Sequence, residues 1–236
     1  MKRSILALGL AAALALPTLA KAAEPAPTPR IVVTGEGSAA VAPDLAILTL
    51  SVMREAKTAR EALDANNAAM TEVIEAIKQF GIADRDLQTA GIQINPRYNY
   101  NNKPDGSQEA ELVAYQVTNT LTVRIRDLVK TGEVLDKAVS LGVNQGGSIA
   151  FANEDPKAVL EEARRKAVEN AMAKARTLSE AAGVELGRVL EISDQTYNSQ
   201  PMPIEAKAFD ARAGAVPVQA GENAYNVQVN MTFELK

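Results

Sequence analysis

Because the sequence contains no histidine and no cysteine, chemistry in this chain is left to carboxylates, hydroxyls, lysine, arginine, tyrosine and amides. Two carboxyl groups held on either side of a bond are sufficient for one class of hydrolase. Four acids are candidates for such a pair: Glu36, Asp44, Asp84 and Asp86. Nothing in their spacing brings them together, so a carboxylate-based hydrolase is only an alternative interpretation.

The absence of imidazole and thiol groups excludes whole classes of site. Catalytic triads and dyads built on histidine or cysteine cannot form, nor can zinc and haem sites that need those ligands. Disulfides are excluded as well, so the core must hold without them. We therefore predict a protein that is not an enzyme, and we assign no catalytic, cofactor-binding or metal-binding residue.

A glycine-rich stretch near the start, residues 34–38 (TGEGS), has two interpretations. Backbone amides at a helix N-terminus can cradle phosphate. Here a strand and Pro43 follow the glycines, and the carboxylate of Glu36 would repel phosphate. We expect a turn or bulge that requires glycine.

A polar loop at residues 99–111 contains Asp105, Glu109 and Glu111. Calcium prefers such oxygen ligands, but their spacing matches no calcium-loop pattern. We expect a solvated hairpin loop. Tyr98 and Tyr100 beside it are candidate contact residues, because tyrosine is common at interfaces.

Charged pairs at i,i+4 spacing lie on the predicted helix of residues 157–182: Glu161 with Arg165 and Glu162 with Lys166. We expect a solvated face, with a charge patch between subunits as the alternative.

The elements follow from hydrophobic periodicity. Alternation predicts strands over residues 30–34, 46–54, 86–94, 112–125, 148–151, 188–194 and 224–235. Helical spacing predicts helices over residues 58–80, 128–141 and 157–182, the last with a seam of small apolar residues: Leu160, Ala163, Ala167, Ala171 and Leu178.

One internal repeat organises these elements. Residues 114–125 and 224–235 share the pattern A-Y-x-V-x-x-x-(L/M)-T-(V/F)-x-(I/L), and each copy follows a helix, a strand and a loop. The predicted fold class is therefore α+β: an antiparallel sheet backed by helices, with two helix–strand–strand units after an N-terminal strand pair. The Pro/Ala/Gly-rich segment of residues 197–223 is either disordered or ordered in an assembly.

The N-terminal residues are typical of a secretory signal. Lys2 and Arg3 precede an apolar run over residues 5–16, Pro17 interrupts it, and residues 20–22 (AKA) match a cleavage site. We expect a signal peptide over residues 1–22, a mobile linker over residues 23–30, and a periplasmic mature protein.

The chain resembles the SIMPL-domain family, long described as a domain of unknown function, and within it the periplasmic immunogenic proteins of Gram-negative bacteria. The matching stretches span most of the chain, and their order is the specific feature: Ile31–Gly37 with Pro43-Asp44, Asn66, Asp86–Thr89, Ile94–Pro96 with Tyr98–Tyr100, Gly147–Phe151, and the alanine-rich helix from Glu162 to Ala175. We assign residues 31–236 to one SIMPL domain. The resemblance implies an α+β fold without an established activity, ring-like homo-oligomers in some members, and a link to oxidative-stress defence in one branch.

Three hypotheses of function follow. The first is a non-enzymatic envelope protein that self-associates through sheet edges and long loops. The second is a periplasmic binding module for a peptide or small ligand, with a concave pocket lined by Tyr98, Tyr100 or Tyr197. The third is the carboxylate-based hydrolase. The net charge of −4 argues against a nucleic-acid partner, and peripheral association with the outer membrane is a further expectation.

Overall fold

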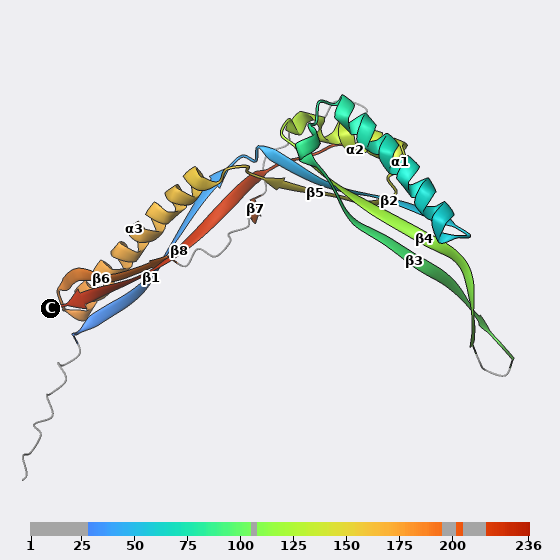
Figure 1. Cartoon of the computed structure of the whole chain (residues 1–236). Helices are drawn as coiled ribbons and strands as arrows, with labels where there is room; N and C mark the ends of the chain where they lie inside the picture. Colours follow the sequence, from blue (N-terminus) through green and yellow to red (C-terminus); the bar gives the residue numbers. More distant parts are fainter. Residues whose placement is uncertain (1–27, 105–107, 195–201, 205–215) are drawn as a thin grey trace, which may run out of the picture.

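The computed structural model describes residues 28–104, 108–194, 202–204 and 216–236, with the backbone alone for residues 202–204. Two elongated arms meet at a bend, and each arm is an antiparallel sheet with helices on the outer side of the bend (Figure 1). Sheet A contains β1 (Arg30–Val41), β8 (Glu222–Leu235), β6 (Leu186–Asp194) and β7 (Met202–Ile204), covered by α3 (Lys157–Ala182). Sheet B contains β3 (Leu87–Asn102), β4 (Gln108–Ile125), β2 (Leu45–Ala56) and β5 (Gln145–Ala152), covered by α1 (Ala59–Gln79) and α2 (Thr131–Ser140).

The arms repeat one β–α–β–β arrangement, and one copy is inserted into the other. Sheet B is built by β2, α1, β3 and β4 with strand order β2-β4-β3, and β5 pairs with the other side of β2. Sheet A is built by β1 and then, after the whole of sheet B, by α3, β6 and β8 with strand order β1-β8-β6. The predicted α+β class with helix-backed antiparallel strands is therefore confirmed.

The sequence repeat falls on the middle strand of each trio, β4 and β8. Equivalent positions of the two copies are buried: Ala114 and Ala224, Val117 and Val227, Leu121 and Met231. The two predicted helix–strand–strand units are the parts of the arms that follow each opening strand.

The two opening strands do not pair with each other, which corrects the predicted N-terminal strand pair. β1 pairs with β8, whereas β2 pairs with β4 and β5. Residues 42–44 lead the chain from one sheet into the other, and the buried Pro43 there cannot continue a ladder because it has no N–H group.

Helix α1 begins at a capping box. Thr58 Oγ1 accepts a hydrogen bond from the Glu61 backbone, and the Glu61 carboxylate accepts one from the Thr58 backbone. Met70, Val73 and Ile77, which lie on one face at helical spacing, are buried on sheet B.

A buried amide fixes α1 on the sheet. Asn66 donates through Nδ2 to the carbonyl oxygens of Val52 on β2 (2.7 Å) and Val117 on β4 (3.0 Å). A buried polar group is costly unless it is bonded, so this contact sets one position of the helix over the two strands.

Helix α3 lies close to β1 because both contribute small side chains. Ala163, Ala167 and Ala171 are fully buried against the strand. A Cβ atom added to Gly35 would overlap the carbonyl oxygen of Ala167, and one added to Gly37 would overlap that of Ala163. Neither glycine has a positive φ. The predicted turn or bulge is therefore wrong, since the glycines lie within β1 and permit close approach of the helix.

Two other predictions differ from the structure. Leu178, assigned to the buried seam, is exposed, and Ala175 and Ser179 are buried instead. The strand predicted over residues 86–94 continues to Asn102, because its polar residues pair with the first residues of β4 as a long hairpin.

Several predicted segments lie wholly or partly outside the described residues. They include the signal peptide of residues 1–22, most of the linker of residues 23–30, and residues 197–201 and 205–215 of the long Pro/Ala/Gly-rich segment. Within that last segment the structure describes β7, which pairs with the first residues of β8.

Replacement of Gly37 by alanine tests the close contact of α3 with β1. We expect Gly37→Ala to lower the free energy of unfolding by about 1–3 kcal/mol, the range for overpacked cores, because its Cβ would displace the α3 backbone. Urea unfolding followed by circular dichroism measures this. Ser38→Ala, at an exposed position of the same strand, is the control and should leave the midpoint nearly unchanged. Equal stability of Gly37→Ala and the unchanged protein would contradict the close contact.

Candidate association surface

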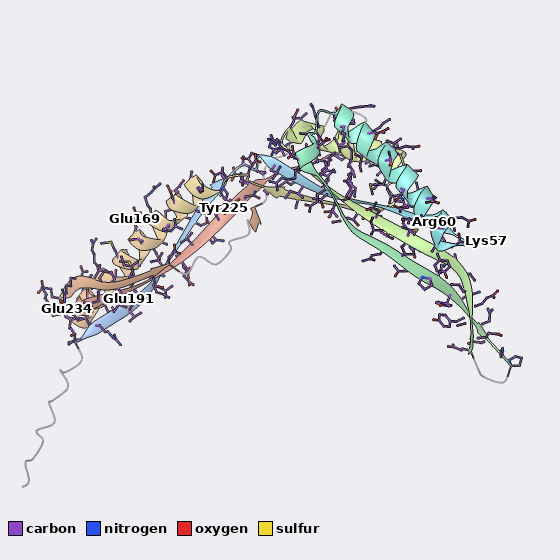
Figure 2. The ribbon with its side chains drawn as sticks, viewed as in Figure 1. Lys57, Arg60, Glu169, Glu191, Tyr225 and Glu234 are labelled. Atoms are coloured by element: carbon purple, nitrogen blue, oxygen red, sulfur yellow. The ribbon has the colours of Figure 1, made fainter. Side chains whose placement is uncertain are left out.

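A two-stranded ribbon extends beyond the helix-covered part of sheet B. β3 and β4 continue past the start of α1 and end in the hairpin (Figure 1). Figure 2 labels Lys57 and Arg60 at the start of α1, and no helix lies above the ribbon side chains beyond this point. Ion pairs brace the ribbon near its base, Arg97 with Glu55 (2.9 Å), and near its tip, Lys103 with Glu109 (2.9 Å).

One face of the ribbon is apolar and exposed. Tyr98 lies opposite Leu112 in the strand register, and Tyr100 follows on the same face. Ile94, also on this face, lies opposite the buried Val117, so the face continues the helix-bearing side of sheet B. The exposed fractions are 46% for Tyr98, 62% for Tyr100 and 44% for Leu112. We call Ile94, Tyr98, Tyr100 and Leu112 the tyrosine face.

The other face of the ribbon is polar. Asn99 lies opposite Glu111, and Asn101 lies opposite Glu109. The ribbon is therefore amphipathic, which is typical of a strand pair that buries one face. The loop predicted over residues 99–111 is wrong for residues 99–102 and 108–111, which are exposed but belong to β3 and β4, while Asp105 lies outside the described residues.

The sheet edges differ in how far they are open. β3 is an edge of sheet B, and no described strand or side chain is hydrogen bonded to its outer side. β5, the other edge, is interrupted by a bulge opposite Thr49 and Leu50, and its Phe151 carbonyl accepts a bond from Asn223 Nδ2 (3.3 Å). β6 is an edge of sheet A with irregular register. The long β3 is thus the clearest open edge in the described chain.

The bend between the arms is held by a hub at Asn153. Its Oδ1 atom accepts bonds from Asn223 Nδ2 (2.9 Å) and Tyr225 Oη (3.1 Å), and its Nδ2 donates to the Ala42 carbonyl (2.8 Å). These bonds join the two segments in which the chain crosses between the arms, residues 42–44 and 153–156. Figure 2 shows Tyr225 on β8 beside the start of α3. Burial raises the pKa of the Tyr225 hydroxyl, which therefore stays protonated and donates.

An ion-pair network lies beside this hub. Arg126 at the end of β4 binds Asp86 (2.6 Å) and the carboxylate of Glu154 (2.6 Å). The Glu154 backbone N–H donates to Asp44 Oδ1 (2.8 Å), which links the network to the β1–β2 crossing. Hydrogen bonds from Arg126 hold the pKa of the Glu154 carboxyl below its usual range, and both acids raise the pKa of Arg126.

The four candidate acids do not form a catalytic pair. Asp44 and Asp86 are brought to the bend, but each is bonded to a donor, the Glu154 amide and the Arg126 guanidinium. Asp84 pairs with Lys78 (2.7 Å), and Glu36 lies on β1 in the other arm. A general acid needs a raised pKa, whereas Arg126 lowers the pKa of the neighbouring Glu154 carboxyl. The geometry does not favour the hydrolase hypothesis.

Tyr98 and Tyr100 of the binding-module hypothesis line neither of two hollows found among the described residues. A hollow of about 440 Å³ lies against the outer face of α3 at Arg164 and Val168, and one of about 210 Å³ lies between Ile74 and Leu121. Tyr98 and Tyr100 stand on the ribbon instead, and Tyr197 lies outside the described residues.

The predicted charge pairs on α3 are present in part. Glu162 and Lys166 form an ion pair (2.7 Å), and this bond holds the pKa of the Glu162 carboxyl below its usual range. Glu161 and Arg165 make no ion pair, although both line the larger hollow. Arg164 binds Asp194 on β6 instead (2.8 Å), a contact between elements that sequence spacing cannot show.

The residues of the bend carry no motif that sequence patterns could identify. Asn153, Glu154 and Asn223 are hydrogen-bonding residues at element ends, outside the predicted helix of residues 157–182. The one available signal was position, because Asn223 immediately precedes the second copy of the repeat.

Comparison with known proteins identifies the family of this chain. The family model described as "SIMPL: Protein of unknown function (DUF541)" matches residues 31–233. The chain belongs to the SIMPL family. A family relative, the 26 kDa periplasmic immunogenic protein of Brucella melitensis, is 51% identical over 233 residues, covering 96% of this chain and 93% of the relative. The uncharacterized protein YggE of Escherichia coli is 30% identical over 243 residues, covering 100% of this chain and 95% of the relative.

The names of these SIMPL relatives describe immunogenic or uncharacterized proteins, and none of them names an enzyme. Over the part of the chain that the structure describes, no helix is long and apolar enough to cross a membrane. In the same part, no three acidic side chains gather into a group that could hold a metal ion.

The ion pair of Arg126 with Glu154 gives a pH-dependent prediction. The folded-state pKa of Glu154 is lowered, so its stabilising effect is present above the usual carboxyl pKa, about 4.3, and is lost as pH falls through the lower folded value. We expect Glu154→Gln to lower the thermal midpoint at neutral pH, with a difference that disappears in strong acid. Glu180→Gln, which removes one negative charge from α3 and not from this network, is the control. A pH-independent difference would contradict the ion pair.

Proposed function

We propose that this protein is a non-catalytic protein of the periplasm that acts by self-association, and that copies meet through the β3–β4 ribbon. The observation that carries the proposal is the tyrosine face, an exposed apolar strip beside an open strand edge. Single exposed apolar residues are normal, but a contiguous apolar strip with a polar rim is typical of an interaction site.

The chemistry of the ribbon suits a second copy of the same chain. Two β3 edges can pair antiparallel about a twofold axis, so each copy supplies the backbone groups that the other lacks. Tyr98 and Tyr100 would then lie beside the same residues of the partner. Tyrosine contributes a large contact area at low cost in conformational entropy, which makes it a frequent binding hot spot.

The periplasmic location rests on two observations. The N-terminal residues have the charge, apolar run and cleavage pattern of a secretory signal, and the Brucella relative is named a periplasmic protein. The absence of histidine and cysteine and the paired state of Asp44 and Asp86 support a role without catalysis. Peripheral association with the outer membrane is part of the proposal, and fractionation of the cell envelope would test it.

Sedimentation velocity of the purified protein tests self-association. We expect an oligomer whose population rises with protein concentration. Replacement of Tyr98 and Tyr100 by serine should raise the dissociation constant at least about tenfold per tyrosine, as expected when interface hot spots are removed. Asn99→Ser with Asn101→Ser, on the opposite face of the same ribbon, is the matched control. A monomer at all concentrations would overturn the proposal. An oligomer unaffected by the tyrosine changes would place the interface elsewhere.

Defence against oxidative or envelope stress is proposed from the resemblance to the family. If it is correct, a strain without the gene should survive peroxide less well than its parent, and the gene supplied on a plasmid should restore survival. Complementation by the Tyr98→Ser, Tyr100→Ser form would then show whether protection depends on the proposed interface. Equal survival with and without the gene would remove the stress role and leave the association proposal standing.

A further inference from the structure

The open edge of β1 is closed by side chains of α3. β1 is the edge strand of sheet A, since β8 alone pairs with it among the described strands. Lys166 Nζ donates to the carbonyl of Ser38 (3.2 Å), and Lys174 Nζ donates to that of Thr34 (2.9 Å). Between these two bonds, the Glu36 backbone N–H donates to Asn170 Oδ1 (3.2 Å).

These bonds lie on the side of β1 that faces away from β8. A backbone N–H makes one strong hydrogen bond, and that of Glu36 is directed to Asn170 rather than to the neighbouring strand. Alternate residues of a strand direct their backbone groups to the same side, so the carbonyls of Thr34 and Ser38 share this outward side. The three α3 residues follow one another at i,i+4 spacing, which places them in one row along the helix.

We propose that Lys166, Asn170 and Lys174 form an edge guard that prevents another strand from pairing with β1. The guard supplies two donors and one acceptor, the set that an added strand would offer to these three groups. It depends on Gly35 and Gly37, because their missing Cβ atoms let α3 lie low enough over β1 for its side chains to reach the edge.

The other arm shows what the guard replaces. In sheet B the strand equivalent to β1 is β2, and its second edge is paired with β5. Sheet A has no described strand at this position, and the guard occupies it. The inference deepens the proposed self-association: with β1 closed, strand pairing between copies is directed to other edges, of which β3 is the longest.

Amide hydrogen exchange tests the guard within a single molecule. We expect Asn170→Ala to speed exchange of the Glu36 N–H about fivefold or more, the ratio that one net hydrogen bond contributes. Amides that pair β1 with β8 should keep their protection. Unchanged exchange at Glu36 would overturn the proposal, and this result does not depend on whether the unchanged protein self-associates.

A second experiment tests the consequence for association. The variant with Lys166→Ala, Asn170→Ala and Lys174→Ala should form an additional, larger species in sedimentation velocity, although it carries more negative charge and repels itself more strongly. Arg165→Ala with Arg176→Ala removes the same two positive charges from α3 without touching β1, and should behave like the unchanged protein. Lys166→Arg with Lys174→Arg keeps the donors and should also behave like it.

The position of the new contact can be established with proline. We call the triple alanine variant of Lys166, Asn170 and Lys174 the guard-free variant. Adding Glu36→Pro to it removes the outward N–H of β1 without removing a hydrogen bond to β8. This change should abolish the additional, larger species. A guard-free variant with the association state of the unchanged protein would overturn the inference. If the unchanged protein is a monomer, only the proposed function is overturned. Hydrogen exchange at Glu36 and sedimentation of the triple variant still test the edge guard.

Discussion

The close contact of α3 with β1 is the constraint on which much of sheet A depends. Gly35 and Gly37 remove the Cβ atoms that would hold the helix away, and the buried alanines Ala163 and Ala167 meet them from the other side. Small residues make a thin core that gains less from apolar burial than a core of large side chains. The same closeness places Lys166, Asn170 and Lys174 at the strand edge, so one packing feature both builds the sheet and limits its growth.

Because one β–α–β–β unit is inserted into another, the chain passes through the bend twice. The chain crosses between the arms at residues 42–44 and again at residues 153–156, and both crossings are tied to the Asn153 hub and the Arg126 network. A fixed relation between the arms matters for a protein that acts through association. Surfaces at the far ends of two arms can meet partners in a defined geometry only if the joint between the arms is firm.

The same architecture separates the association surface from the rest of the molecule. Tyr98, Tyr100 and Leu112 of the tyrosine face lie in the part of the β3–β4 ribbon that extends beyond α1, away from the bend. This part is uncovered because the hairpin strands are longer than the helix that covers their bases. The guard on β1 and the bulge on β5 restrict two other edges, so edge length, side-chain cover and strand irregularity together determine where strand pairing is available.

The sequence by itself determined the α+β class, the places of the three helices and the repeat, because hydrophobic periodicity is a local property of the chain. It also determined that histidine and cysteine chemistry is absent. Only the tertiary structure decided that the opening strands belong to different sheets, that Gly35 and Gly37 serve packing rather than a turn, and that Asn153 and Arg126 hold the bend. These features depend on contacts between residues far apart in the chain, and local periodicity contains no information about which distant strands will meet.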